Sequence, residues 1–565
     1  MYSLKGWRGI EPGFGVWVRS GVDGSGVRGR RAVCEMGMMK ESSLPGHAWP
    51  LRPRTEVKYP LQKSIVRFVM GHPRKNVPCV QLRDSDESEF AIVVEAGAMR
   101  ECLTIRNGFC EEWIDVEYED IEQLEIMFRV QKGGVEIGRL AILGTDLRER
   151  QGSLRKPLME NSVIGYLTID YLVVTNLPAA EMATVEDGIS NVRAPRFVGH
   201  RGSGAKGTSP YMENTVLSFV NATRTSDVTH VELDVQLTRD GVPVIFHDFH
   251  VPLKTNDEKA SCMVPICSMT SQQFVDLDPA VLCDDDTHLS DDDSTLRSRT
   301  SVRAPFKKPR ARVELGGPVK DLMPKLADIC NECPVEIGLM IELKYPTLEY
   351  LEEYKIHFPS RNLFADRVLE TVLETEGNSR RSIIFLTFDA DLAMIFRAKQ
   401  SRYPVYFLSE EYGDDSGGAT TEYYDWRCIR GENAVDFAKA VSLQGNVFFV
   451  DVALQKPYLV ERAHQKGLVL MTYGKANSNS AIVEKQLQLK VDGVIADNVN
   501  LLTTELLGTE ANESEEEKTA KISRDTPTSD IFTKRSTSKA SSVTAANESE
   551  NASGPPQAPG ESMTV

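Results

Sequence analysis

Eight short apolar runs alternate with helix-length stretches between about residues 195 and 505. The runs are rich in β-branched and aromatic residues and occupy residues 196–200, 230–237, 336–344, 382–388, 404–409, 446–450, 468–473 and 492–497. Helix-length stretches lie between several of them, at 364–375, 390–400 and 457–466. Strands that alternate with helices indicate parallel βαβ units, and eight such units over about 300 residues favour an α/β fold of the (β/α)8 TIM-barrel type over an open doubly wound sheet. The sequence contains neither a GxGxxG nor a GxxxxGK[ST] motif, which weakens nucleotide-binding alternatives.

A different pattern precedes this region. Between residues 56 and 180, seven short β-branched runs are separated by turn pairs such as Asn107-Gly108 and Gly133-Gly134. This pattern predicts a smaller all-β, sandwich-like domain. Residues 1–55 show no sustained period and stay unassigned, with poor order expected. The tail at 506–565 is rich in Glu, Ser and Thr and is expected to be disordered.

A charged insertion interrupts the barrel pattern at about 254–325. Its centre passes from an acidic block at 283–293 to a basic block at 303–312. Adjacent blocks of opposite charge with Ser and Thr are typical of a solvated excursion from one loop, and this interpretation is favoured over a docking site.

Charge and apolar run length exclude some function classes. The net charge of −17 disfavours a general nucleic-acid binder, which needs a basic footprint. No apolar run approaches the roughly 18 residues of a membrane span, and the first 40 residues lack the apolar core of a signal peptide. Ten scattered cysteines form no disulfide framework, so a cytoplasmic location is expected.

Three carboxylates are expected to meet at the C-terminal end of the barrel. Glu232 and Asp234 are two residues apart in one predicted strand and therefore project to the same face, while Glu342 lies near the end of the next strand. Three crowded carboxylates would repel one another unless they bound a cation. An oxygen-rich set of this kind suits one divalent cation, Mg²⁺ or Ca²⁺.

Two histidines and two cations accompany these carboxylates. His200 and His247 both end strand-like runs, and imidazole can act as acid or base near neutral pH. Arg201 and Lys344 add positive charge suited to a phosphate. Acid, base, divalent cation and anion-binding groups together indicate phosphodiester cleavage.

An ordered series of motifs resembles the glycerophosphodiester phosphodiesterase family over about residues 195–502. The matching residues are His200-Arg201-Gly202, Glu213-Asn214-Thr215, Glu232 with Asp234, Thr238 to Gly241, His247-Asp248 and Glu342 with Lys344, followed by weaker matches at Phe388-Asp389, Thr472-Tyr473 and Gly493 to Asp497.

The resemblance implies a role for each of these positions. It implies that His200 and His247 are the acid/base pair. The metal ligands that it implies correspond to Glu232, Asp234 and Glu342, whereas the phosphate and substrate contacts correspond to Arg201, Lys344, Glu213 and Asn214.

The chain also resembles the eukaryotic cytosolic glycerophosphocholine phosphodiesterases, in which a β-rich region precedes the barrel. The resemblance implies a small-molecule glycerophosphodiester substrate, with glycerol 3-phosphate and choline as products. Residues 1–55 are too short and unpatterned to be the starch-binding module common in that branch. A choline head group favours a nearby aromatic face, for which Tyr345, Trp426 and Tyr473 are candidates by loop position.

Two alternatives stay open. One is a lysophospholipase D that acts on lysophospholipids, and the other is a non-catalytic interaction protein that uses the β domain and the acidic segments. The sequence does not identify protein partners, and it leaves open which histidine is the acid and whether the nucleophile is water or the glycerol 2-hydroxyl.

Overall fold

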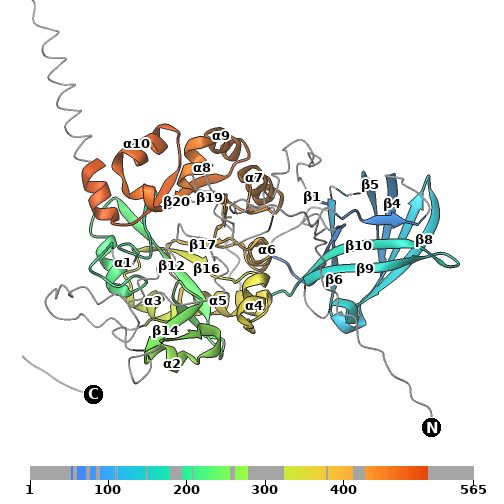
Figure 1. Cartoon of the computed structure of the whole chain (residues 1–565), viewed down its shortest axis with the longest axis horizontal. Helices are drawn as coiled ribbons and strands as arrows, with labels where there is room; N and C mark the ends of the chain where they lie inside the picture. Colours follow the sequence, from blue (N-terminus) through green and yellow to red (C-terminus); the bar gives the residue numbers. More distant parts are fainter. Residues whose placement is uncertain are drawn as a thin grey trace, which may run out of the picture. The chain divides into compact units, whose positions relative to one another are not determined.

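The computed structural model describes residues 52–54, 60–71, 77–83, 89–108, 110, 112–147, 151–177, 194–205, 208–254, 261–277, 323–376, 379–411, 425 and 427–506. Most of the segment 1–55, the charged centre of the predicted insertion and the tail beyond residue 506 lie outside the described residues. The described strands form two large sheets and one two-stranded sheet (Figure 1).

The first large sheet is antiparallel except for the pairing of β1 with β6. Its strands are β1 (Arg52–Pro53), β2 (Ser64–Met70), β3 (Val80–Leu82), β4 (Glu89–Ala96), β5 (Met99–Arg106), β6 (Glu112–Tyr118), β7 (Glu125–Lys132), β8 (Val135–Leu143), β9 (Gln151–Met159) and β10 (Val163–Val174). Every second residue in the middle of β7 is buried, as expected where one face of a strand covers a core. Gly133 and Gly134 connect β7 to β8 with φ of 54° and 83°, the left-handed values that a tight hairpin turn requires. The predicted all-β region is thus confirmed.

The second large sheet closes into a barrel of eight parallel strands. These are β11 (Phe197–Gly199), β12 (Val228–Leu237), β16 (Gly338–Leu343), β17 (Ile383–Thr387), β18 (Val405–Leu408), β19 (Gly445–Phe449), β20 (Val469–Tyr473) and β21 (Gly493–Ala496). β11 pairs with both β12 and β21, so the first strand joins the last. Each strand overlaps one of the eight predicted runs, and the TIM-barrel prediction is confirmed.

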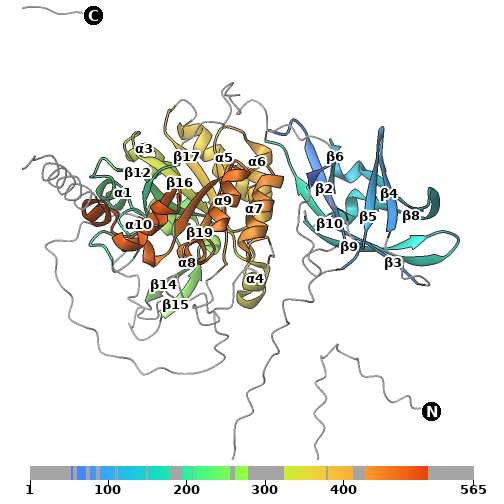
Figure 2. The same ribbon diagram turned by 90° about the horizontal axis from the view of Figure 1, so that it is seen from above.

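Helices surround the barrel strands (Figures 1 and 2). They are α1 (Val216–Ala222), α3 (Leu326–Glu332), α4 (Leu348–Tyr354), α5 (Arg361–Glu376), α6 (Ala390–Lys399), α7 (Gly431–Ala440), α8 (Val450–Gln455), α9 (Tyr458–Gln465) and α10 (Ser480–Gln488). Because the helices cover the outer surface, all five residues of β17 are buried, which explains its continuous apolar sequence. No helix within the described ranges is both long and apolar enough to cross a membrane.

Part of the predicted insertion is folded. β13 (Pro243–Ile245) pairs antiparallel with β12, and β14 (His250–Lys254) and β15 (Ser261–Pro265) form a hairpin. α2 (Ser271–Val275) follows, and it begins with a capping box between Thr270 and Gln273. Figure 2 shows this hairpin on the same side of the barrel as α4 and α8, which follow the C-terminal ends of β16 and β19. The described part of the insertion therefore lies at the end of the barrel where the carboxylates are predicted.

Candidate active site

The three predicted carboxylates lie together at the C-terminal ends of β12 and β16. Asp234 is the register partner of Glu342 in the parallel pair, and Glu232 projects to the same face as Asp234 because side chains alternate along a strand. One carboxylate oxygen from each residue lies within 4.8 Å of the other two. The strand register thus brings together a set that is separated by 110 positions in the sequence.

Burial makes this cluster electrostatically costly without a cation. Glu232 and Asp234 are 3% and 1% exposed. Burial, followed by the charge of Asp234, raises the pKa of Glu232 to about 8. The Oε2 atom of Glu232 accepts a hydrogen bond from the backbone N–H of Arg201 at 2.9 Å, whereas its buried Oε1 atom has no hydrogen-bond partner among the described residues. A buried carboxylate oxygen without a donor, beside two further carboxylates, fits the donor set of a hard divalent cation.

A strained turn places Arg201 against the carboxylates. Arg201 has a φ of 47°, and Gly202 has a φ of 89°. A Cβ atom on Gly202 would lie 2.5 Å from Ser218 Oγ, which explains the glycine. Arg201 donates from Nη1 to Glu213 Oε1 at 3.1 Å, and its Nε atom lies 3.5 Å from Asp234 Oδ2. The turn therefore holds one guanidinium group between two acidic side chains.

Asn214 fixes the orientation of Asp234. Its Nδ2 donates to Asp234 Oδ2 at 2.8 Å, and its Oδ1 accepts from the Asp234 backbone N–H at 3.2 Å. Asn214 has a φ of 59°, a conformation that asparagine tolerates better than most residues. The next residue, Thr215, is the N-cap of α1 and accepts from the Ser218 N–H. The predicted Glu-Asn-Thr segment thus orients a carboxylate and begins a helix.

Lys344 completes the charge pattern. Its Nζ donates to Glu342 Oε1 at 2.9 Å and lies 3.8 Å from Asp234 Oδ1. Burial lowers the pKa of Lys344, but the charges of Glu342 and Asp234 outweigh burial and raise it above its ordinary value. For Asp234, burial raises the pKa, but nearby positive charge, including that of Arg201 and Lys344, outweighs burial and lowers it below its ordinary value. Lys344 is therefore positively charged, and Asp234 is negatively charged, at neutral pH.

Each predicted histidine is hydrogen bonded to an aspartate. His200 follows β11, and its Nδ1 donates to Asp497 Oδ1 at 2.8 Å. Burial lowers the pKa of His200, but the hydrogen bond and charge of Asp497, with the charge of Glu232, raise it to about 9. His247 Nδ1 donates to Asp248 Oδ1 at 2.7 Å, and Asp248 is 70% exposed. The residue before His247, Phe246, donates its backbone N–H to the Asp234 carbonyl at 2.9 Å, so His247 lies next to the strand that carries the carboxylates.

Asp497 is a further site residue, and in the sequence it belongs only to the weak motif match at Gly493 to Asp497. It directly follows β21, and its Oδ1 accepts from both His200 Nδ1 and the Ala205 backbone N–H, each at 2.8 Å. Pairing of β21 with β11 brings it to His200 across 297 positions. Its place directly after the eighth predicted strand indicates that it lies beside His200, because the first and last strands are neighbours in a closed barrel.

This geometry can be compared with known proteins. The sequence model of the glycerophosphoryl diester phosphodiesterase family matches residues 200–501, just over half of the 565-residue chain. The chain belongs to this family. The match begins at His200 and includes both histidines, all three clustered carboxylates and Asp497.

Curated relatives of this phosphodiesterase-family chain include glycerophosphocholine phosphodiesterases. The Candida albicans enzyme is 28% identical over 397 residues, which cover 63% of this chain and 33% of that protein. The Homo sapiens enzyme is 28% identical over 384 residues, which cover 64% of this chain and 54% of that protein. The chain thus spans about half of the length of these relatives or less, and the predicted resemblance to them is confirmed. A solved glycerophosphodiester phosphodiesterase from Thermotoga maritima is 20% identical and covers 56% of this chain and 99% of its own, with a TM-score of 0.34.

The predicted aromatic residues differ in their surroundings. Tyr345 is 6% exposed, its hydroxyl donates to the Pro359 carbonyl at 2.7 Å, and its ring packs against Phe358 and Arg361. Tyr473 is partly exposed at the end of β20, where its hydroxyl donates to the Ser409 carbonyl at 3.1 Å. Trp426 lies outside the described residues.

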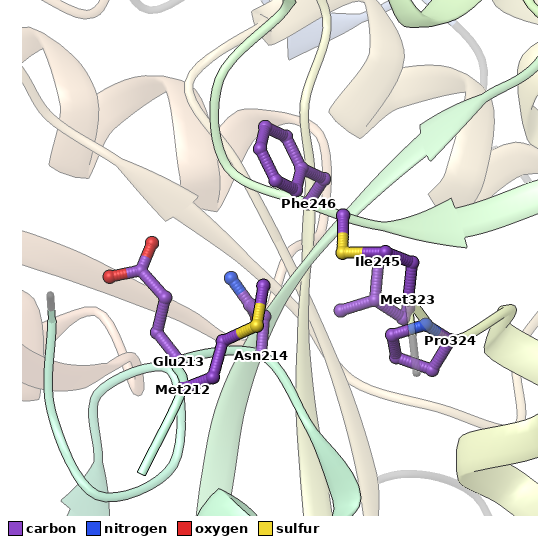
Figure 3. A pocket seen from close by; sticks show the side chains of 7 residues that line it. All are labelled: Met212, Glu213, Asn214, Ile245, Phe246, Met323 and Pro324. Atoms are coloured by element: carbon purple, nitrogen blue, oxygen red, sulfur yellow. The ribbon is translucent and has the colours of Figure 1, made fainter. Parts of the chain in front are cut away.

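A small, largely apolar pocket adjoins the charged cluster of this family member. It is lined by Met212, Glu213, Asn214, Ile245, Phe246, Met323 and Pro324 (Figure 3). Glu213 and Asn214 are the residues that contact Arg201 and Asp234, and Phe246 directly precedes His247. The pocket therefore offers apolar contacts immediately beside the groups that carry charge.

Proposed function

We propose that this chain hydrolyses glycerophosphodiesters and that glycerophosphocholine is its substrate, with sn-glycerol 3-phosphate and choline as products. The observation that carries the proposal is the meeting of three carboxylates, two histidines, one arginine and one lysine at the same end of the barrel. The names of the curated relatives support the choice of glycerophosphocholine.

Glu232, Asp234 and Glu342 would hold one divalent cation, Mg²⁺ or Ca²⁺. The partnerless Oε1 of Glu232 and the closeness of the three carboxylates support this assignment. When bound, the cation supplies positive charge that stabilises the charge developing on the phosphate. Arg201 and Lys344 add two fixed positive charges at the same place, and they bind the phosphate oxygens.

The two histidines divide the proton transfers. His200 is protonated at neutral pH because its pKa is about 9, so it is the acid that donates a proton to the leaving choline oxygen. His247 is the base that accepts a proton from the nucleophile, either water or the glycerol 2-hydroxyl. The bond between phosphorus and the choline oxygen breaks as a bond from phosphorus to the nucleophile forms. Water gives sn-glycerol 3-phosphate directly, whereas the glycerol 2-hydroxyl gives a cyclic phosphate, whose ring water must then open to give the same product. Asp497 holds the His200 ring so that its Nε2–H is available for donation.

We also propose that the chain is located in the cytoplasm. The support for this location is that Cys79, Cys330 and Cys428 are buried free thiols, as expected in a reducing compartment. Neither a nucleic acid nor a protein partner is required by the chemistry.

The decisive assay mixes purified full-length chain with glycerophosphocholine and measures choline and glycerol 3-phosphate with Mg²⁺, with Ca²⁺ and with chelator. We expect both products in the presence of a divalent cation and none with chelator. His200→Ala, His247→Ala and Glu232→Gln should each lose activity while keeping a cooperative unfolding transition. A parallel reaction with lysophosphatidylcholine separates lysophospholipase D activity, and absence of hydrolysis of every glycerophosphodiester by the wild-type chain would refute the proposal.

A further inference from the structure

Gln236 shares the strand face that carries the clustered carboxylates. It lies on β12 two residues beyond Asp234, so Glu232, Asp234 and Gln236 project to the same side. Gln236 is 1% exposed. Its Nε2 atom donates to three consecutive backbone carbonyls, those of Phe246 at 2.8 Å, His247 at 3.2 Å and Asp248 at 2.8 Å. One buried amide group is therefore bonded to the main chain on both sides of His247.

The segment held in this way lies between two strands. β13 ends at Ile245 and β14 begins at His250, so residues 246–249 belong to no described strand. The Phe246 N–H donates to the Asp234 carbonyl at 2.9 Å, and Gln236 binds the three carbonyls that follow. Together these bonds attach the His247 backbone to the strand that carries Glu232 and Asp234.

The two polar atoms of the Gln236 amide group differ in their partners. Its Nε2 atom binds three carbonyls, whereas its Oε1 atom is buried without a hydrogen-bond partner among the described residues. A buried acceptor without a donor destabilises the fold, so this amide group is held in place by the bonds that Nε2 makes. Rotating the amide to satisfy Oε1 would place that oxygen against three carbonyl oxygens, so only the observed orientation is consistent with the contacts.

We propose that Gln236 is a positioning residue. It holds the backbone of His247 beside the carboxylate cluster, so that the His247 ring can accept the proton of the nucleophile. This inference rests on the proposed phosphodiesterase function. Asp248, which bonds to the His247 ring, is 70% exposed, whereas Gln236, which bonds to the His247 backbone, is buried and anchored in a barrel strand. A small displacement of a catalytic group lowers the rate far more than it lowers substrate binding.

Gln400 provides a matched control. It is also buried and also binds loop backbone, because its Nε2 donates to the Tyr403 carbonyl at 2.8 Å and its Oε1 accepts from the Tyr403 N–H at 2.7 Å. It follows α6 and precedes β18, so it lies at the N-terminal end of the barrel strands, away from the candidate site. Methionine has the length of glutamine and cannot donate, which makes Gln236→Met and Gln400→Met a suitable pair.

The experiment measures kcat and KM for glycerophosphocholine hydrolysis and backbone hydrogen exchange over residues 243–250. For Gln236→Met we expect a roughly 100-fold lower kcat with little change in KM, and faster exchange in that segment. Gln400→Met should keep wild-type kcat and exchange there. Gln236→Leu, which also cannot donate a hydrogen bond, should behave like Gln236→Met and serves if the methionine variant does not fold.

A double-mutant cycle with His247→Ala distinguishes positioning from general destabilisation. If Gln236 acts through His247, Gln236→Met should not lower further the small residual kcat of His247→Ala. Equal losses of kcat for the two glutamine variants, or fully additive losses with His247→Ala, would overturn the inference. An inactive wild-type chain would refute the proposed function instead, and the exchange measurement would still decide whether Gln236 holds the segment.

Discussion

Asp497→Asn tests how the candidate site sets the charge of His200. The substitution keeps the size of the side chain but removes the negative charge that accepts from His200 Nδ1 at 2.8 Å. The pKa of His200 is about 9 against an ordinary 6.5. At about 1.4 kcal/mol for each pKa unit, that difference corresponds to roughly 3 kcal/mol of interaction with the protonated ring. Without Asp497, burial and the charge of Arg201 remain and lower the pKa of His200, while the charge of Glu232 still raises it.

The expected change in the pH–rate profile has a definite sign. The proposed acid must be protonated, so wild-type kcat/KM should fall as pH rises through about 9. In Asp497→Asn this fall should move down towards the ordinary value of about pH 6.5, and kcat/KM at pH 7.5 should drop about 10-fold.

Stability should change in the same pH window. A histidine whose pKa is raised on folding stabilises the protein below its unfolded pKa of about 6.5, and this contribution disappears as pH rises through the folded value of about 9. Urea unfolding in chelator should therefore show a cost of Asp497→Asn of roughly 3 kcal/mol at pH 6 and little cost near pH 10.

Asp492→Asn is the matched control. Asp492 flanks the other end of β21, accepts from His464 Nε2 at 2.9 Å and also accepts from the Leu470 backbone N–H at 2.7 Å. It thus has the same kinds of partner as Asp497 but lies at the opposite end of the strand. Its substitution should leave the pH–rate profile unchanged. A profile for Asp497→Asn that superimposes on that of wild type would show that the reasoning about His200 is wrong.

Three further perturbations have defined outcomes. Glu232→Gln should abolish hydrolysis. It should also raise the melting temperature of the metal-free protein at pH 9 but not at pH 4. The reason is that burial raises the pKa of Glu232 from its ordinary 4.5 to about 8, so that its ionisation destabilises the folded protein as pH rises above 4.5. Lys344→Met should cost roughly 3–5 kcal/mol in urea unfolding because it leaves the buried Asp234 and the partly buried Glu342 without their lysine. Added Mg²⁺ should restore part of the loss, and no response to Mg²⁺ would argue against the cation site. Gly202→Ala should destabilise more than Gly97→Ala in the same measurement, since both glycines have positive φ but only a Cβ atom on Gly202 would lie 2.5 Å from Ser218 Oγ. Equal costs would contradict this.

The barrel and the placement of its charged residues could be predicted from the sequence because they depend on strand periodicity. Alternation along one strand puts Glu232 and Asp234 on one face, and the C-terminal ends of parallel strands meet, which brings Glu342 beside them. The same alternation bears on Tyr345. It directly follows Lys344, whose amine reaches the carboxylates, and its own ring packs among Phe358, Phe364 and Arg361.

Other features depend on contacts that no local pattern encodes. The bond between His200 and Asp497 exists only because the last strand pairs with the first. The three bonds of Gln236 depend on the path of a segment between strands. The folded residues 261–277 were included in a charged insertion because of neighbouring composition, although Phe274 is buried in a small core of its own with Val251 and Ile266.

Barrel closure has a consequence for the order of events during synthesis. Asp497 reaches His200 only when β21 docks between β20 and β11, and β21 is the last strand of the barrel to leave the ribosome. A contact between residues so far apart forms late, because the long intervening chain must first be ordered. A partly synthesised barrel would therefore carry a His200 without Asp497, and the acid of the proposed reaction would be in place only when the ring of strands is complete.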